Sequence, residues 1–130
     1  MMKLGFMTFA TPDWDLPKVL TAAIRYGYDS VEPRAEAGHK HGVELDTTKR
    51  QRKEIKAAFA DMGVDLCCIA TSRTYSMANA AERAESVRLT KRYIDLAADC
   101  GAPCIRVFGG PTPEGADYAE AFAGRNLMFG

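Results

Sequence analysis

Two stretches that otherwise look like short buried strands carry charged residues. Glu32 and Arg34 belong to "SVEPR" (30–34), and Arg106 belongs to "CIRVFGG" (104–110). Side chains alternate along a strand, so Glu32 and Arg34 share one face while Val31 takes the other. A charge inside a sheet is costly unless it is paired, which couples Glu32 with Arg106 or with Arg34. The pattern leaves two interpretations open, a functional site and a structural ion pair.

Strand parity predicts the side on which these charges lie. A parallel sheet places branched aliphatic side chains against its covering helices, so Val31, Ile105 and Val107 are expected to face the helices. Glu32, Arg34 and Arg106 then lie on the opposite side. In a barrel that side is the interior, and alternate strands supply the same layer of side chains.

Further polar residues follow the ends of all four predicted strands. Ligands of parallel β/α folds bind at this edge because every strand-to-helix loop converges there, so the pattern favours a small-molecule site. The residues are Thr8, Thr11, His39, His41, Glu44, Thr71, Ser72, Arg73, Tyr75, Gly109 and Gly110. The "HKH" pair (39–41) resembles a metal-binding pair, but two loop histidines are expected to be solvated. The basic "KRQRK" run (49–53) is expected to form the solvated face of a helix.

Four cysteines occur, and they form no C-x-x-C pair. Cys67 and Cys68 are adjacent within an apolar run and are expected to point to opposite faces. Cys100 and Cys104 flank a helix-to-strand turn. We expect four buried free thiols in a reducing compartment, and hence a cytoplasmic protein.

The elements that must position these residues alternate along the chain. Strands are predicted at 3–9, 30–34, 64–72 and 104–110. The helices between them run from Asp15 to Gly27, from about Thr48 to Gly63, and from about Asn79 to Gly101, each closing on glycine. Their expected apolar stripes are Leu16, Val19, Leu20, Ala23 and Ile24; Ile55, Ala58, Phe59 and Met62; and Val87, Ile94, Ala97 and Ala98.

This alternation predicts an α/β fold with a parallel sheet. The repeat is close to the ~30 residues per unit of an eight-stranded barrel, and it also fits a small doubly wound sheet. Seventeen basic and seventeen acidic residues cancel, which argues against nucleic-acid and anionic membrane partners. No apolar run is long enough for a membrane span, and no signal peptide is evident.

Several of these stretches together resemble the xylose isomerase-like TIM barrel superfamily of sugar phosphate isomerases and epimerases, which is grouped with the endonuclease IV-like barrels. They are "GYDSVEPR", "GHKHGVELD", "VDLCCIATS" and "CGAPCIRVFGG". The resemblance covers about residues 3–118. It implies a barrel with a divalent metal at its C-terminal face, which assists proton transfer between adjacent carbons of a ketose or hydroxy-ketone.

The resemblance also implies roles for individual residues. Glu32 matches the family's glutamate at the end of strand two and is the expected catalytic residue. His41 and Arg106 match pocket-lining positions, and with Arg34 and Thr8 they are expected to bind a carbohydrate-like substrate. The family's metal ligands come from later strands, so this chain alone is expected to bind no metal.

The fold class that follows is a parallel (βα)4 half of a TIM barrel, truncated after strand four. Residues 1–123 are expected to form this half and 124–130 an aberrant tail, because "PEGADYAEAF" (113–122) looks like the start of a fourth helix whose pattern stops at Gly124. An open half barrel exposes two sheet edges. It would also expose Phe6, Leu66, Cys68 and Phe108, which are expected on or near the interior face.

The sequence therefore leaves two candidate functions open, and three ways in which an open half barrel could behave. The chain is either a catalytically incomplete isomerase or epimerase, or a non-catalytic binding or assembly module. Two histidines and zero net charge argue against a third function, a nuclease of the endonuclease IV type, which needs several metal-binding histidines and a basic groove. The half barrel is expected to complete its sheet as a homodimer, to flatten into a doubly wound layer, or to aggregate.

Overall fold

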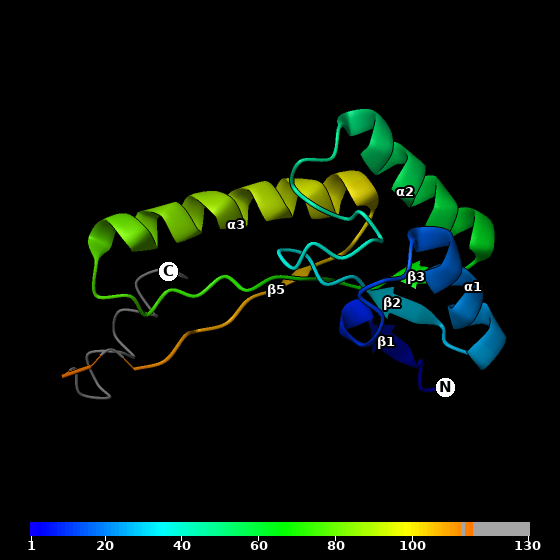
Figure 1. Ribbon diagram of the computed structural model, residues 1–130, viewed down its shortest axis with the longest axis horizontal. Helices are drawn as coiled ribbons and strands as arrows, with labels where there is room; N and C mark the ends of the chain where they lie inside the picture. The colour runs from blue at the N-terminus through cyan, green and yellow to red at the C-terminus, as the bar shows by residue number, and fades with distance from the viewer. Residues whose placement is uncertain (113, 116–130) are drawn as a thin grey trace.

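The protein alternates short parallel strands with helices, and helices lie on one side of the strands (Figure 1). The computed structural model describes residues 1–112 and 114–115. The strands are β1 (Gly5–Met7), β2 (Ser30–Glu32), β3 (Asp65–Leu66), β4 (Ile69–Ala70) and β5 (Ile105–Arg106). The helices are a 3-10 turn (Thr8–Ala10), α1 (Leu16–Tyr26), α2 (Lys49–Met62) and α3 (Ala80–Cys100). The predicted fourth helix and the tail from 124 lie outside the described residues.

Local capping explains where the helices begin and end. Asp15 accepts a hydrogen bond from the Lys18 amide at 2.9 Å, and Thr48 and Gln51 form a reciprocal capping box. The side chain of Asn79 accepts from the first amides of α3. Each of α1, α2 and α3 ends on a glycine in the left-handed conformation, as the sequence predicts.

The third predicted strand is divided between two partners. β1, β2 and β3 pair in parallel, with Val31 opposite Leu66, whereas β4 pairs with β5. Further along, Arg34 lies opposite Ala70, so the two residues 32–33 face the three residues 67–69. This extra residue is a β-bulge. It coincides with Pro33, which has no amide to donate to the ladder.

Backbone pairing continues beyond β4 and β5. The amides of Thr71 and Phe108 bond the carbonyls of Arg106 and Arg73, and the Tyr75 amide bonds the Gly109 carbonyl at 3.2 Å. The two segments form an extended arm beneath the first half of α3 (Figure 1). The Ser86 hydroxyl on α3 donates to the Thr74 carbonyl at 2.7 Å and ties the helix to this arm.

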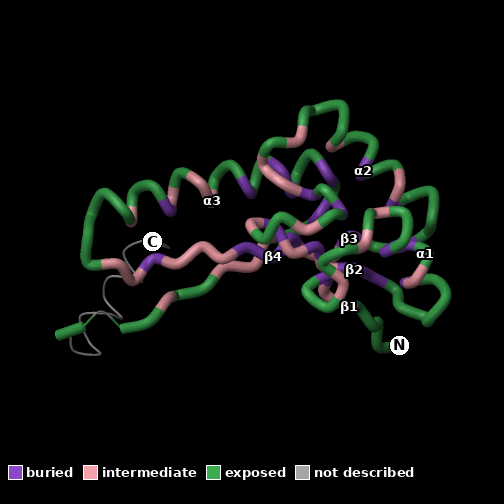
Figure 2. Tube along the Cα trace, in the orientation of Figure 1, coloured by how far each residue is buried: buried purple, intermediate pink, exposed green. Residues whose placement is uncertain are grey.

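One core lies between the sheet and the helices, and the other sheet face is uncovered (Figures 1 and 2). Val31 is fully buried in this core, and Ile105 packs against it, as parity predicts. The expectation that Phe6 and Leu66 face the interior of a barrel is wrong. Both are register partners of Val31, and side chains of register partners point to the same side, so they join the core.

The helical stripes are partly displaced from the prediction. Ile24, Met62, Ile94 and Ala98 are exposed, whereas α3 buries Ser86, Tyr93, Leu96, Ala97 and Cys100. α3 has apolar residues on more than one side, so its own pattern does not select a face. Packing against α2 and the β4–β5 arm selects the face that carries Tyr93.

The cysteines also differ from the expectation. All four are free, but only Cys100 is buried, and Cys104 is exposed. The bulge breaks the alternation at Cys67 and Cys68, because Leu66 and Ile69 on either side of them both face the core. Adjacent positions therefore do not simply take opposite faces here.

No helix in the described part of the chain combines the length and apolar composition that a bilayer span needs.

Candidate functional site

Glu32 and Arg106 form an ion pair on the sheet face opposite the helices. Arg106 Nε donates to Glu32 Oε1 at 3.0 Å. The two residues come from β2 and β5, with the chain segment of β3 and β4 between them. Ala70, the register partner of Arg106, lies on that segment. The pairing confirms the predicted coupling of Glu32 with Arg106.

The surroundings of Arg106 hold its side chain while leaving the pair accessible. The Thr71 hydroxyl donates to the Arg106 carbonyl at 2.8 Å, and Arg106 Nη2 lies 3.5 Å from Met7 Sδ. The guanidinium lies 4.7 Å from the centre of the exposed Phe108 ring. The side chains of Glu32 and Arg106 retain 25% and 32% of their exposure. A ligand on this face can therefore contact both groups.

Arg34 takes part in a second cluster, which is directed into the protein. Its guanidinium donates to the carbonyls of Ala35 and Ala70 and to the Ser72 hydroxyl. These acceptors lie on the two chain segments that run side by side after the bulge. Arg34 therefore joins strand ends together.

Glu36 and Arg73 extend this cluster with an ion pair that is shorter than the Glu32–Arg106 pair. Arg73 Nε lies 2.6 Å from Glu36 Oε1, and their side chains are 25% and 13% exposed. Glu36 also accepts a hydrogen bond from the Ser72 amide. Its backbone has φ of 66°, a conformation that costs a non-glycine residue roughly 1–2 kcal/mol. Glu36 is not among the predicted site residues, although it shares the parity of Glu32 and Arg34 in the sequence.

Thr8 and His41 are buried beside Arg34 and bond to its backbone. The Thr8 hydroxyl accepts from the Arg34 amide at 2.8 Å, and His41 Nε2 donates to the Arg34 carbonyl at 3.1 Å. His41 Nδ1 accepts from the Val43 amide at 3.1 Å. Burial lowers the pKa of His41 to about 4, so the ring is neutral at pH 7. The expectation of a solvated loop histidine is wrong for His41.

The predicted site residues thus fall into two groups. Glu32 and Arg106 meet on the open sheet face, whereas Thr8, Arg34 and His41 meet within the second cluster. The polar atoms of Thr8 and His41 serve backbone partners, as do most of those of Arg34. Their roles in substrate binding stay predictions. The contacts that they make in the structure hold the strand ends in place.

Other polar groups near this edge form no metal centre. His39 and His41 have ring centroids 5.5 Å apart, and Glu44 Oε2 accepts from the Glu36 amide at 3.0 Å. Among the described residues, no three His, Cys, Asp or Glu side chains lie close enough to hold a metal ion.

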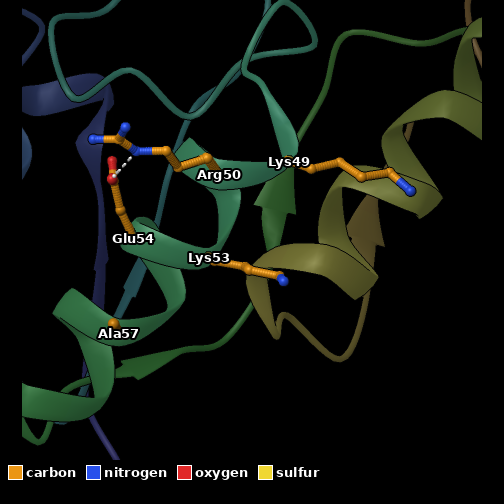
Figure 3. A pocket seen from close by; sticks show the side chains of 5 residues that line it. All are labelled: Lys49, Arg50, Lys53, Glu54 and Ala57. Atoms are coloured by element: carbon orange, nitrogen blue, oxygen red, sulfur yellow. Dashed lines mark hydrogen bonds and ion pairs between the residues drawn. The ribbon is translucent and has the colours of Figure 1, made fainter.

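The basic run at 49–53 lines a shallow hollow on α2 (Figure 3). Arg50 pairs with Glu54 at 2.8 Å, while Lys49 and Lys53 project from other positions on the same helix. Arg52 departs from the predicted solvated face, because it reaches Asp99 on α3 at 3.0 Å and is largely covered. All residues that line the hollow belong to one helix, so no second element forms an opposite wall.

The parallel strands, the one-sided helical cover and the open face with its ion pair define half of a parallel β/α barrel. A profile of the xylose isomerase-like TIM barrel family matches residues 20–127. The chain therefore belongs to the xylose isomerase-like TIM barrel family. A comparison with curated proteins finds no match.

Solved structures support the same fold. The probable 3-DHS dehydratase AsbF of Bacillus anthracis has a TM-score of 0.73 at 15% identity, over 98% of this chain and 46% of its own. A D-psicose 3-epimerase has a TM-score of 0.72 at 19% identity, over 98% of this chain and 47% of its own. A xylose isomerase domain protein from Planctomyces limnophilus has 0.62 at 20% identity, over 96% and 48%. The chain thus spans about half the length of these structures.

Proposed function

We propose that this chain supplies the N-terminal half of a sugar or sugar phosphate isomerase or epimerase. In this proposal Glu32 moves a proton between adjacent carbons of a ketose or hydroxy-ketone. The observation that carries it is the partly exposed Glu32 carboxylate on the open sheet face, held there by Arg106. Membership of the family and a structural neighbour named as an epimerase support the reaction class.

The geometry of the ion pair suits proton transfer by a fixed carboxylate. Arg106 engages Oε1 of Glu32, which leaves Oε2 for a substrate proton. The Thr71 hydroxyl donates to the Arg106 carbonyl and fixes the backbone of β5. Arg106 therefore holds the Glu32 carboxylate from an anchored strand. Positioning of this kind brings a reacting carbon and a base into contact, and a positioned acid–base group contributes typically 10²–10⁴-fold to a rate.

The family resemblance also implies a divalent metal, which would supply polarisation of a substrate oxygen. The described residues do not fit such an ion, because they offer no group of three metal-binding side chains. We therefore assign proton transfer and substrate positioning to this half, and the metal ligands to the remaining strands of a complete barrel.

The test is Glu32→Gln in an assembled barrel that contains this half. Exchange of solvent deuterium into a ketose, followed by NMR, measures the proton transfer directly. We expect the exchange rate to fall by at least about 100-fold, with a loss of unfolding free energy below about 1 kcal/mol. Glu54→Gln, on the exposed face of α2, should leave exchange unchanged. If Glu32→Gln lost as much unfolding free energy as it lost in the activation free energy of exchange, Glu32 would be a structural residue.

We propose a second copy of this chain as the partner that completes the sheet. β1 and β5 each have one neighbouring strand among the described residues, and Phe9 and Phe108 are exposed. Unpaired edges and exposed aromatic rings favour association. Sedimentation equilibrium should give twice the mass of the chain, and a monomer at all concentrations would contradict this proposal.

A further inference from the structure

Cys68 and Cys104 lie side by side on neighbouring parallel segments. Ile69 pairs with Ile105, and the Ile69 amide donates to the Cys104 carbonyl at 3.2 Å. Neighbouring strands lie about 4.8 Å apart, which is within the range of about 4.4–6.8 Å between the Cα atoms of a disulfide. The backbone thus brings the two cysteines within reach of a covalent bond without rearrangement of the sheet.

The side chains support the same pairing. Cys104 Sγ lies 3.5 Å from the Cys67 carbonyl, so it points across to the segment that carries Cys68. The pKa of Cys68 is raised to about 12, first by burial and then by the adjacent Cys104 thiol. The other two thiols have different surroundings. Cys67 donates to the Val31 carbonyl, and Cys100 is buried at the end of α3.

The two thiols differ in accessibility. Cys104 is exposed, whereas Cys68 is partly covered. A soluble oxidant therefore reaches Cys104 first, and Cys68 is placed to react second. This is the geometric arrangement of an attacking and a resolving thiol, and the raised pKa of Cys68 makes its step the slower of the two.

We propose that Cys68 and Cys104 form a reversible disulfide by exchange with a small-molecule disulfide. The Cys104 thiolate attacks one sulfur of the reagent, and one reagent thiolate leaves and takes up a proton. Cys68 then loses its proton and attacks Cys104 Sγ, which forms the Cys68–Cys104 bond and expels the second reagent thiol. Two protein thiols are oxidised, and one reagent disulfide is reduced to two thiols.

The bond would act on the candidate site. Arg106 follows Cys104 by two positions, and the Glu32 carboxylate is close enough to Cys68 to raise the pKa of its thiol. A disulfide would fix β4 against β5 next to the Glu32–Arg106 pair. It would also close a long chain loop that includes α3, so the oxidised protein should unfold at a higher temperature than the reduced one.

Oxidised glutathione followed by mass spectrometry provides the test. We expect the intact protein to lose the mass of two hydrogen atoms and to carry no glutathione, with peptide mapping that links Cys68 to Cys104. Dithiothreitol should restore the original mass. In Cys68→Ser the reaction should stop with glutathione attached to Cys104, and in Cys104→Ser no intramolecular bond should form.

Matched controls separate this pair from the remaining thiols. Cys67→Ser and Cys100→Ser should each still form the Cys68–Cys104 bond. A bond to Cys67, a bond between two chains, or a persistent glutathione adduct on the unmodified sequence would overturn the proposal. None of these outcomes depends on whether the chain has isomerase activity.

Discussion

The two charged clusters at the strand ends contain the same residue types, glutamate and arginine, but their side chains have different partners. Arg34 and Glu36 direct their charges to backbone carbonyls, a backbone amide and the Ser72 hydroxyl within the protein, and Glu36 also pairs with Arg73. Glu32 and Arg106 bond chiefly to each other and keep a quarter to a third of their side chains exposed. Charges that serve the backbone hold the strand ends together. A pair that spares an oxygen and faces solvent is available to a ligand.

The largest loss of stability is expected when Arg73 is replaced. Arg73→Met leaves Glu36 largely buried without its cation, and breaking a fully buried pair costs about 3–5 kcal/mol. Because Glu36 and Arg73 keep 13% and 25% exposure, we expect a loss of about 2–3 kcal/mol. Urea unfolding measures this difference. Arg88→Met, which removes an exposed pair with Glu85 on α3, is the matched control and should leave stability unchanged.

A second, smaller effect concerns His41 and pH. Its pKa is lowered from 6.5 to about 4 in the folded protein. Between these values the unfolded chain binds a proton that the folded protein does not, so stability falls as the pH drops. From pH 7 to pH 5 we expect a loss of up to about 2 kcal/mol.

Urea unfolding at both pH values tests this expectation. His41→Gln should be less stable at pH 7 but should show a flatter dependence of stability on pH between pH 5 and pH 7. Equal slopes in His41→Gln and the unmodified protein would show that His41 is protonated in the folded state.

The smallest effect is expected at the open pair. Arg106→Met removes a partly solvated partner of Glu32, and exposed ion pairs contribute roughly 0–1 kcal/mol. We therefore expect a loss below about 1 kcal/mol by the same urea measurement. A loss as large as that of Arg73→Met would remove the contrast between the clusters and make the Glu32–Arg106 pair part of the scaffold.

Much of the fold could be predicted because its signals are local. The caps at Asp15 and Thr48, the closing glycines and the apolar strands each act within a few residues. Parity placed Val31 correctly and led to the Glu32–Arg106 pairing. It failed for Phe6 and Leu66. Parity relates residues within one strand, and only the register between strands shows that Phe6 and Leu66 lie on the same face as Val31.

The candidate site was predictable only in part for a related reason. Several polar residues follow the strands, and no pattern shows which of them bond to the backbone. Thr8 and His41 are buried through contacts with Arg34, more than 25 residues from Thr8 in the chain. Glu36 reaches Arg73 from a backbone with positive φ, a conformation that a glutamate rarely adopts.

By itself, the sequence determined the order of strands and helices, the ends of the helices, and the side of the sheet on which Glu32 and Arg106 lie. These follow from hydrogen bonding and alternation over short stretches of chain. The tertiary structure alone decided the bulge opposite Pro33, the proximity of Cys68 to Cys104, and which ion pair stays open to solvent. The reason is register: pairing between segments tens of residues apart sets which atoms meet, and short-range preferences do not specify it.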